Sequence, residues 1–154
     1  MKKAIVIGAS SGIGKELTKI FASHGYEVGI AARRTDLLNE LSAEMPTKTY
    51  VATIDIKNTD IAIQSLKKLI KDVGDVDIIV INSGIGHINP SLDWPQEKET
   101  IDTNVSGFTA MAGVAMHYFI QKGSGHLVGI SSIASIRGSD KCPAYNASKA
   151  FMSN

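Results

Sequence analysis

Short apolar runs alternate along the chain with longer segments in which apolar residues recur every three or four positions. The short runs predict strands, because branched apolar residues dominate them and glycine or polar residues bound them. They lie at Lys3–Ile7, Glu27–Ala32, Thr49–Ile54, Val76–Ile81 and Leu127–Ile130. The fourth run is almost continuously apolar, which is typical of a central strand that is buried on both faces of a parallel sheet.

The longer segments have the spacing of helices. The first, Ile13–His24, places four apolar side chains on one face: Ile13, Leu17, Ile20 and Phe21. We predict a second helix around Leu37–Met45 with Thr35 or Asp36 as its cap, and a third that begins at Asn58, Thr59 or Asp60 and ends at Val73. A long helix is expected over Glu97–Ile120, and Pro143 is expected to open a last one.

The segment Gly84–Gln96 breaks this alternation. It contains two glycines, two prolines, His87 and the single tryptophan, so we expect a loop. A loop that follows a central strand often lines a site. The alternating strands and helices predict parallel strands with right-handed crossovers, and hence a doubly wound α/β sheet.

Composition limits the classes of protein to consider. A chain of 154 residues with 44% hydrophobic and 20% charged residues predicts one folded domain, residues 1–154. A net charge of +1 without a basic cluster argues against a nucleic-acid partner. The lone Cys142 rules out an internal disulfide and fits the cytoplasm, and no apolar run is long enough for a membrane span. The four histidines lack metal-ligand spacing, so we expect no metal site.

A glycine-rich turn lies between the first strand and the first helix, with the spacing G-x-x-x-G-x-G over Gly8–Gly14. Glycines let a backbone approach a pyrophosphate closely, and a helix N-terminus offers free N–H groups to that anion. The alternative is a turn of small residues that serves packing. We predict nucleotide binding by six residues of this turn: Gly8, Ser10, Ser11, Gly12, Ile13 and Gly14.

This glycine spacing, together with the motifs described next, resembles the short-chain dehydrogenase/reductase family, and in particular its NADP-dependent bacterial members. The resemblance runs from Lys3 to Asn154. It implies a Rossmann-type three-layer α/β/α fold with strand order 3-2-1-4-5 and later strands missing, so the domain is expected to be incomplete at its C-terminal end.

The residues after the second strand bear on the choice of cofactor. In Rossmann-type sites an acidic residue about 20 positions beyond the glycines binds the ribose 2′-hydroxyl, whereas arginine suits a 2′-phosphate. Here Arg33 and Arg34 occupy that region and no acidic residue ends the strand. We therefore expect NADP(H) rather than NAD(H), although two solvated surface charges would leave the same sequence. Ser10 is a further candidate for contact with the phosphate.

Other cofactor contacts follow from the resemblance alone. Asp55-Ile56 resembles the family's adenine-contacting pair, and Asn82-Ser83-Gly84 resembles its Asn-Asn-Ala-Gly stretch. Without the resemblance, Asp55 is equally a capping residue and Asn82 a turn residue.

Tyr145 and Lys149 are four positions apart and therefore share one face of the last predicted helix. An ammonium near a phenol favours the phenolate and lowers the pKa of a group normally near 10. This pair alone is weak evidence, because a surface helix often carries it by chance. Two more residues match the family's catalytic set: Ser132, 13 positions before Tyr145, and Asn104. Ser131 is the competing serine.

The resemblance implies hydride transfer between NADP(H) and a carbonyl or alcohol substrate. In reduction Tyr145 gives a proton to the substrate oxygen, Ser132 orients that oxygen, and Lys149 also binds the nicotinamide ribose. Asn104 supports a water that links the lysine to solvent. Tyr145 and Lys149 are therefore expected to contact both the cofactor and the reacting groups.

The family's fold normally continues beyond the helix that bears Tyr145 and Lys149, so we interpret the chain as a piece of a longer enzyme. Its parent is expected to be a cytoplasmic homodimer or homotetramer. The alternative function is a nucleotide-binding fragment without catalysis. The sequence does not name the substrate or the physiological direction of the reaction.

Overall fold

A computed structural model describes residues 2–154. It contains five strands in one parallel sheet with the order β3-β2-β1-β4-β5, as the resemblance implied. The strands are β1 (Lys3–Ile7), β2 (Glu27–Ala32), β3 (Thr49–Thr53), β4 (Ile78–Ile81) and β5 (His126–Gly129). Each lies within two residues of its predicted bounds.

The helices follow the predicted order with one exception. They are α1 (Gly12–Ser23), α2 (Thr35–Ala43), α3 (Thr59–Val73), α4 (Trp94–Ile101), α5 (Phe108–Lys122) and α6 (Pro143–Ser153). The predicted long helix Glu97–Ile120 is α4 and α5 joined by a π-helical stretch, Asp102–Gly107. A 3₁₀-helix, Ile133–Ile136, interrupts the polar connection before α6.

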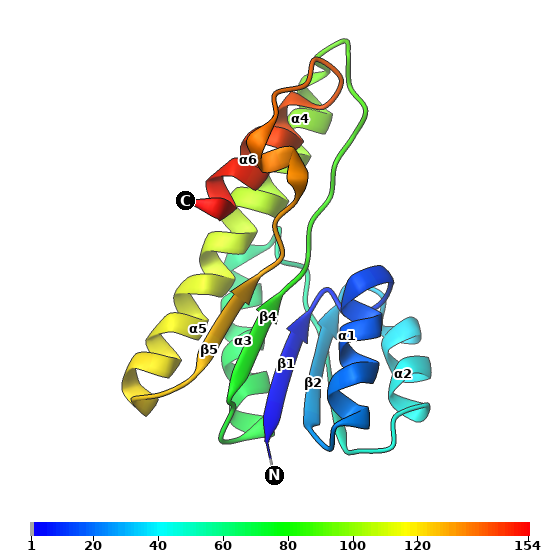
Figure 1. The fold of residues 1–154 in the computed structure, drawn as a ribbon, viewed down its shortest axis with the longest axis vertical. Helices are drawn as coiled ribbons and strands as arrows, with labels where there is room; N and C mark the ends of the chain where they lie inside the picture. The colour runs from blue at the N-terminus through cyan, green and yellow to red at the C-terminus, as the bar shows by residue number, and fades with distance from the viewer. Residues whose placement is uncertain (1) are drawn as a thin grey trace.

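Two apolar cores cover the two faces of the sheet, which gives the three layers visible in Figure 1. Helices α3 and α5 pack on one face and α1 and α2 on the other. Strand β1 is the centre of both cores, with Ala4–Ile7 fully buried. At 25 cal/mol per Å² of apolar area, burying an isoleucine contributes about 1.5–3 kcal/mol, so this strand anchors the fold.

Helix α1 packs differently from the prediction. Gly14, Thr18 and Ala22 are the buried residues of α1, whereas Ile13 and Ile20 are 61% and 53% exposed. Small side chains let the helix backbone approach the sheet closely, and the closest face of the helix is then not the most apolar one. Ile13 is thereby left at the edge of a cleft.

One predicted cap is corrected: Arg34 is the N-cap residue of α2, rather than Thr35 or Asp36. Asn58, one of the three residues predicted to cap the third helix, is the N-cap residue of α3. Neither Arg34 nor Asn58 makes a side-chain capping bond. By contrast, Pro143 does open α6, as predicted. Figure 1 shows α4 and α6 beyond the carboxyl ends of β4 and β5, where the chain builds its sites.

Candidate functional site

The glycine-rich turn between β1 and α1 is held against the end of β4. Asn82 donates from Nδ2 to the carbonyl of Gly8 over 3.0 Å. A methyl group at Gly14 would lie 2.6 Å from this same Nδ2 and would also overlap the Gly8 carbonyl, so only glycine fits. Gly8, Gly14 and Asn82 thus hold the turn after β1 firmly against the end of its neighbour, β4.

Gly12, by contrast, has open space where a side chain would be. Its φ of +55° suits glycine, and a methyl group there would have no neighbour within 4 Å. The N-terminus of α1 has no side-chain cap, so its first N–H groups are not taken up by the N-cap side chain, Ser11. Free N–H groups with no side chain in front of them are what a pyrophosphate requires.

The turn forms one wall of a cleft of about 310 Å³. All the predicted cofactor-binding residues line it except Gly14, which lies behind the turn, and Tyr145 and Lys149. The lining residues among them are Gly8, Ser10, Ser11, Gly12, Ile13, Arg33, Arg34, Asp55, Ile56, Asn82, Ser83 and Gly84. Thr103 of the π-helical stretch also lines this dinucleotide cleft, although it belongs to no motif that predicted it.

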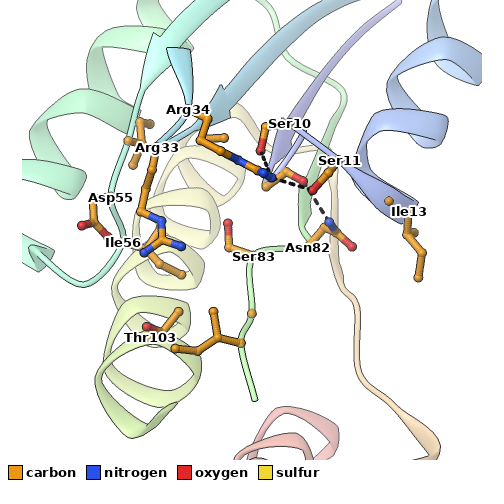
Figure 2. A pocket seen from close by; sticks show the side chains of 16 residues that line it. Ser10, Ser11, Ile13, Arg33, Arg34, Asp55, Ile56, Asn82, Ser83 and Thr103 are labelled. Carbon is orange, nitrogen blue, oxygen red and sulfur yellow. Dashed lines mark hydrogen bonds between the residues drawn. The ribbon is translucent and has the colours of Figure 1, made fainter. Parts of the chain in front are cut away.

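The two arginines occupy different parts of the dinucleotide cleft (Figure 2). Arg34 donates from one nitrogen to the hydroxyls of Ser10 and Ser11, over 3.0 and 2.7 Å. Figure 2 shows Arg33 extending along the wall formed by Asp55 and Ile56. The cleft therefore has two guanidinium groups, one of them beside hydroxyls of the glycine-rich turn.

A second cleft of about 460 Å³ adjoins the first. Four residues line both: Ile13, Asn82, Gly84 and Ile85. The remaining lining residues come from the segment after β4, from the end of β5 and from α6: Gly86, His87, Ile88, Ile130, Ser131, Cys142, Tyr145 and Lys149. A dinucleotide lying in the first cleft could thus extend into this tyrosine cleft.

Tyr145 and Lys149 meet in the tyrosine cleft. The Nζ of Lys149 lies 5.8 Å from the centre of the Tyr145 ring and donates to the carbonyl of Ile130 over 2.8 Å. Lys149 is only 5% exposed, and its burial lowers the pKa of the ammonium below the ordinary 10.5. The Tyr145 ring rests against Gly86, where a methyl group would lie 2.6 Å from it. Gly86 is a site residue that the sequence analysis missed.

Asn104 is fully buried in the π-helical stretch. Its Oδ1 accepts from the N–H of Ile85 over 2.9 Å, and its Nδ2 donates to the carbonyl of Ile85 and to the hydroxyl of Ser148. It therefore joins the segment after β4 to α6. A π-turn places a residue out of the regular helical order and is frequent at functional sites, which agrees with this role.

The two candidate serines are placed differently. Ser131 lines the tyrosine cleft and donates its hydroxyl to the carbonyl of Lys149 over 3.1 Å. Ser132 is the N-cap of the following 3₁₀-helix, where its hydroxyl oxygen accepts from the N–H of Ala134. Ser132 is not among the residues that line the cleft, but its hydroxyl proton is left free to donate.

His87 lines the tyrosine cleft and belongs to a hydrogen-bonded group of three side chains. Its Nε2 lies 3.1 Å from Glu99, whose other oxygen binds the Lys57 ammonium over 3.1 Å. The hydrogen bond from Lys57 holds the pKa of the Glu99 carboxyl below its usual range, and His87 adds to this. The group joins the segment after β4 to the segment after β3.

Two kinds of feature are absent from residues 2–154. No three side chains of the His, Cys, Asp and Glu types are placed together to hold a metal ion there. In the same part of the chain, every helix is too short or too polar to cross a bilayer.

Comparison with known proteins gives consistent results. Residues 2–154 match the family described as short chain dehydrogenase. An uncharacterized oxidoreductase of Myxococcus xanthus (strain DK1622) is 34% identical over 157 residues, which cover 99% of this chain and 62% of that protein. The 3-oxoacyl-(acyl-carrier-protein) reductase of Chlamydia muridarum is 32% identical, with 97% and 62% covered. The chain thus spans 62% of the length of these relatives.

Solved structures share the fold. An alcohol dehydrogenase from Thermococcus sibiricus, complexed with 5-hydroxy-NADP, has a TM-score of 0.88 at 27% identity, over 97% of this chain and 66% of that one. A 3-ketoacyl-(acyl-carrier-protein) reductase from Brucella melitensis, complexed with NADH, has a TM-score of 0.89 at 26% identity, over 98% and 65%. With the family match over residues 2–154 and these relatives, the chain belongs to the short-chain dehydrogenase/reductase family of oxidoreductases.

Proposed function

We propose that this chain binds NADP(H) in the dinucleotide cleft and transfers a hydride to or from a carbonyl or alcohol substrate in the tyrosine cleft. The observation that carries the proposal is that the two clefts share Ile13, Asn82, Gly84 and Ile85. The nicotinamide end of a dinucleotide bound at the glycine-rich turn can therefore reach Tyr145.

The residues present fit the cofactor. Gly12 leaves open space before the N-terminus of α1, where a pyrophosphate would lie. Arg33 and Arg34 line the same cleft, and a guanidinium grips a phosphate by two parallel hydrogen bonds. The only acidic residue that lines the cleft is Asp55, on the wall along which Arg33 extends. These features favour NADP(H) over NAD(H).

When bound, the cofactor supplies the hydride acceptor or donor. Tyr145 would give a proton to the substrate oxygen in reduction and take it back in oxidation, which is general acid–base catalysis worth typically ~10²–10⁴-fold. The Lys149 ammonium would stabilise the Tyr145 phenolate and bind the nicotinamide ribose. Ser131 lines the tyrosine cleft and Ser132 does not, so the role of Ser132 rests on its spacing from Tyr145: it would donate its free hydroxyl proton to the substrate oxygen. Asn104 would keep the segment after β4 against α6.

A fluorescence titration with NADPH, beside one with NADH, tests the cofactor assignment. Tight binding of NADPH and weak binding of NADH is the expected result, and a preference for NADH would overturn the role given to the arginines. Reduction of diacetyl or ethyl acetoacetate by NADPH then separates the two candidate functions. Binding without turnover of either ketone would favour a nucleotide-binding protein over a reductase.

A further inference from the structure

Helix α6 lacks a cap of its own, although it carries Tyr145 in its first turn. Cys142 occupies the N-cap position without a side-chain capping bond, and Pro143 has no N–H to offer. The first free N–H of the helix, that of Ala144, donates to Oε2 of Glu97 over 3.1 Å. Glu97 belongs to α4, 47 residues away. A carboxylate at a helix N-terminus is stabilised by the helix dipole, so α4 supplies the missing cap.

The other oxygen of Glu97 has a partner of its own. Asn89, which is 1% exposed, donates from Nδ2 to Glu97 Oε1 over 2.7 Å. The Oδ1 of Asn89 accepts from the N–H of Asp93 over 2.9 Å, which fixes how the amide is turned. The N–H of Asn89 donates to the carbonyl of Lys141, just before α6. A buried asparagine thus orients Glu97 and joins the segment after β4 to the chain that leads into Tyr145.

Only a carboxylate satisfies this arrangement. Glu97 accepts from two N–H donors, the Ala144 backbone and the Asn89 amide, one at each oxygen. A glutamine has a single acceptor oxygen and would present an N–H to one of the two donors. An aspartate at position 89 would bring a second negative charge against Glu97. The charge of Glu97 is therefore matched to the amide of Asn89.

We propose that Glu97, oriented by Asn89, is a positioning residue for the reaction: it fixes the start of α6 and with it the place of the Tyr145 hydroxyl in the tyrosine cleft. This inference rests on the proposed function. Asn104 holds the same helix one turn later, through Ser148. Tyr145 thus lies between two fixed points, and both are provided by the α4 and π-helical segments.

Three variants test the proposal: Glu97→Gln, Asn89→Asp and the two together. Glu97→Gln sets an amide N–H against one of two N–H donors, and Asn89→Asp sets a carboxylate against Glu97 and against the Asp93 carbonyl, to which the Asn89 amide also donates over 3.0 Å. In the double variant the amide introduced at 97 donates to the carboxylate introduced at 89, while its oxygen accepts from Ala144. The bond to the Asp93 carbonyl stays lost, so the double variant restores the hold on α6 in part. Asp102→Asn is the matched control. It removes one negative charge directly after α4, where the carboxylate of Asp102 binds only the exposed Lys98.

The kinetic readout separates positioning from general damage. Each single variant should lower kcat for diacetyl reduction by about 10–100-fold, because a misplacement of about 1 Å can cost about 10²-fold. The KM for diacetyl and the Kd for NADPH should stay within about twofold, since neither Asn89 nor Glu97 lines the tyrosine cleft or the dinucleotide cleft. The double variant should recover at least about tenfold in kcat, and Asp102→Asn should match wild type. A double variant no better than the worse single one would overturn the proposal.

Amide hydrogen exchange over Ala144–Lys149 keeps this test separate from that of the proposed function. Exchange should be faster in both single variants and slower again in the double variant. Unchanged exchange overturns the proposal, and so does faster exchange with unchanged kcat, because the bond would then be structural only. A wild-type chain that binds NADPH but reduces neither ketone would overturn the proposed function. The amide exchange rates would still show whether Glu97 fixes the start of α6.

Discussion

The dinucleotide cleft takes most of its walls from turns that directly follow β1, β2, β3 and β4, whereas the tyrosine cleft also needs α6, which lies beyond the carboxyl ends of β4 and β5. In the first, the parallel sheet itself brings the turns together, and bonds such as Arg34 to Ser10 and Asn82 to Gly8 run between neighbouring strand ends. In the second, the bonds from Asn104 to Ser148 and from Ala144 to Glu97 join α6 to the helical segments above the sheet. Under the proposed function, cofactor binding therefore depends on the sheet, and proton transfer depends on how α4 and α6 are held above it.

Removal of the tyrosine hydroxyl should separate the two clefts most sharply. Tyr145→Phe is expected to lower kcat for diacetyl reduction by at least ~10²–10⁴-fold, because the general acid is lost. The Kd for NADPH should stay near its wild-type value, since the dinucleotide cleft is untouched. Steady-state kinetics and fluorescence titration measure the two quantities. Tyr26→Phe, directly before β2 and outside both clefts, is the matched control, and retained turnover in Tyr145→Phe would contradict the catalytic assignment.

A methyl group in the glycine-rich turn should damage the first cleft instead. Gly14→Ala would overlap the Gly8 carbonyl and the Asn82 amide, so we expect a loss of about 1–3 kcal/mol in the free energy of unfolding, together with lost NADPH binding. Urea unfolding and NADPH titration measure these effects. Gly113→Ala on α5 meets nothing within 4 Å and is expected to be neutral or to stabilise by about 0.5–1 kcal/mol. Equal behaviour of the two variants would contradict the packing argument.

The arginines should affect one cofactor and spare the other. Arg33→Ala and Arg34→Ala are each expected to weaken NADPH binding by about tenfold to a hundredfold, since hydrogen bonds to charged groups contribute about 1.5–3 kcal/mol. NADH binding should change by less than about threefold. Parallel titrations of both cofactors measure the ratio, with Arg137→Ala, which lies outside the dinucleotide cleft, as the control. Equal losses for NADPH and NADH would mean that the arginines do not read the 2′-phosphate.

The smallest expected effect is a change in melting temperature when Lys149 is replaced by methionine, and its sign tests whether the buried charge destabilises the fold. Burial lowers its pKa in the folded chain, so at neutral pH the charged lysine destabilises the fold. Lys149→Met should therefore raise the melting temperature at neutral pH while it abolishes turnover. As pH rises through the folded pKa of Lys149 towards 10.5, the wild-type lysine becomes neutral and the difference should shrink. Thermal melts across this window check it. Lys67→Met is the control, because it removes an ammonium from an exposed position on α3.

Periodicity and turn chemistry predicted the sheet and the glycine-rich turn. Strand ends meet at one edge of a parallel sheet, so Gly12 and Arg33 can be assigned to one cleft without coordinates. Asp55 and Asn82 were assigned to this cleft only through the family resemblance, because their local sequence equally fits a cap and a turn. The predicted apolar face of α1 was wrong in part, because the residue that approaches the sheet closest, Gly14, contributes no hydrophobicity. Likewise Glu97–Ile120 has one helical period throughout, and only the surroundings of Asn104 decide that it contains a π-turn.

By itself, the sequence determined the parallel α/β fold, the glycine-rich turn and the pairing of Tyr145 with Lys149, because each depends on residues that are neighbours along the chain or on one helix. Only the tertiary structure decided that Gly86 supports the tyrosine ring and that Glu97 and Asn89 cap the helix beneath it. Those contacts join α4, the segment after β4 and α6, and no local pattern records them. Their energy comes from buried hydrogen bonds, which exist only when distant donors and acceptors have been brought together and shielded from water.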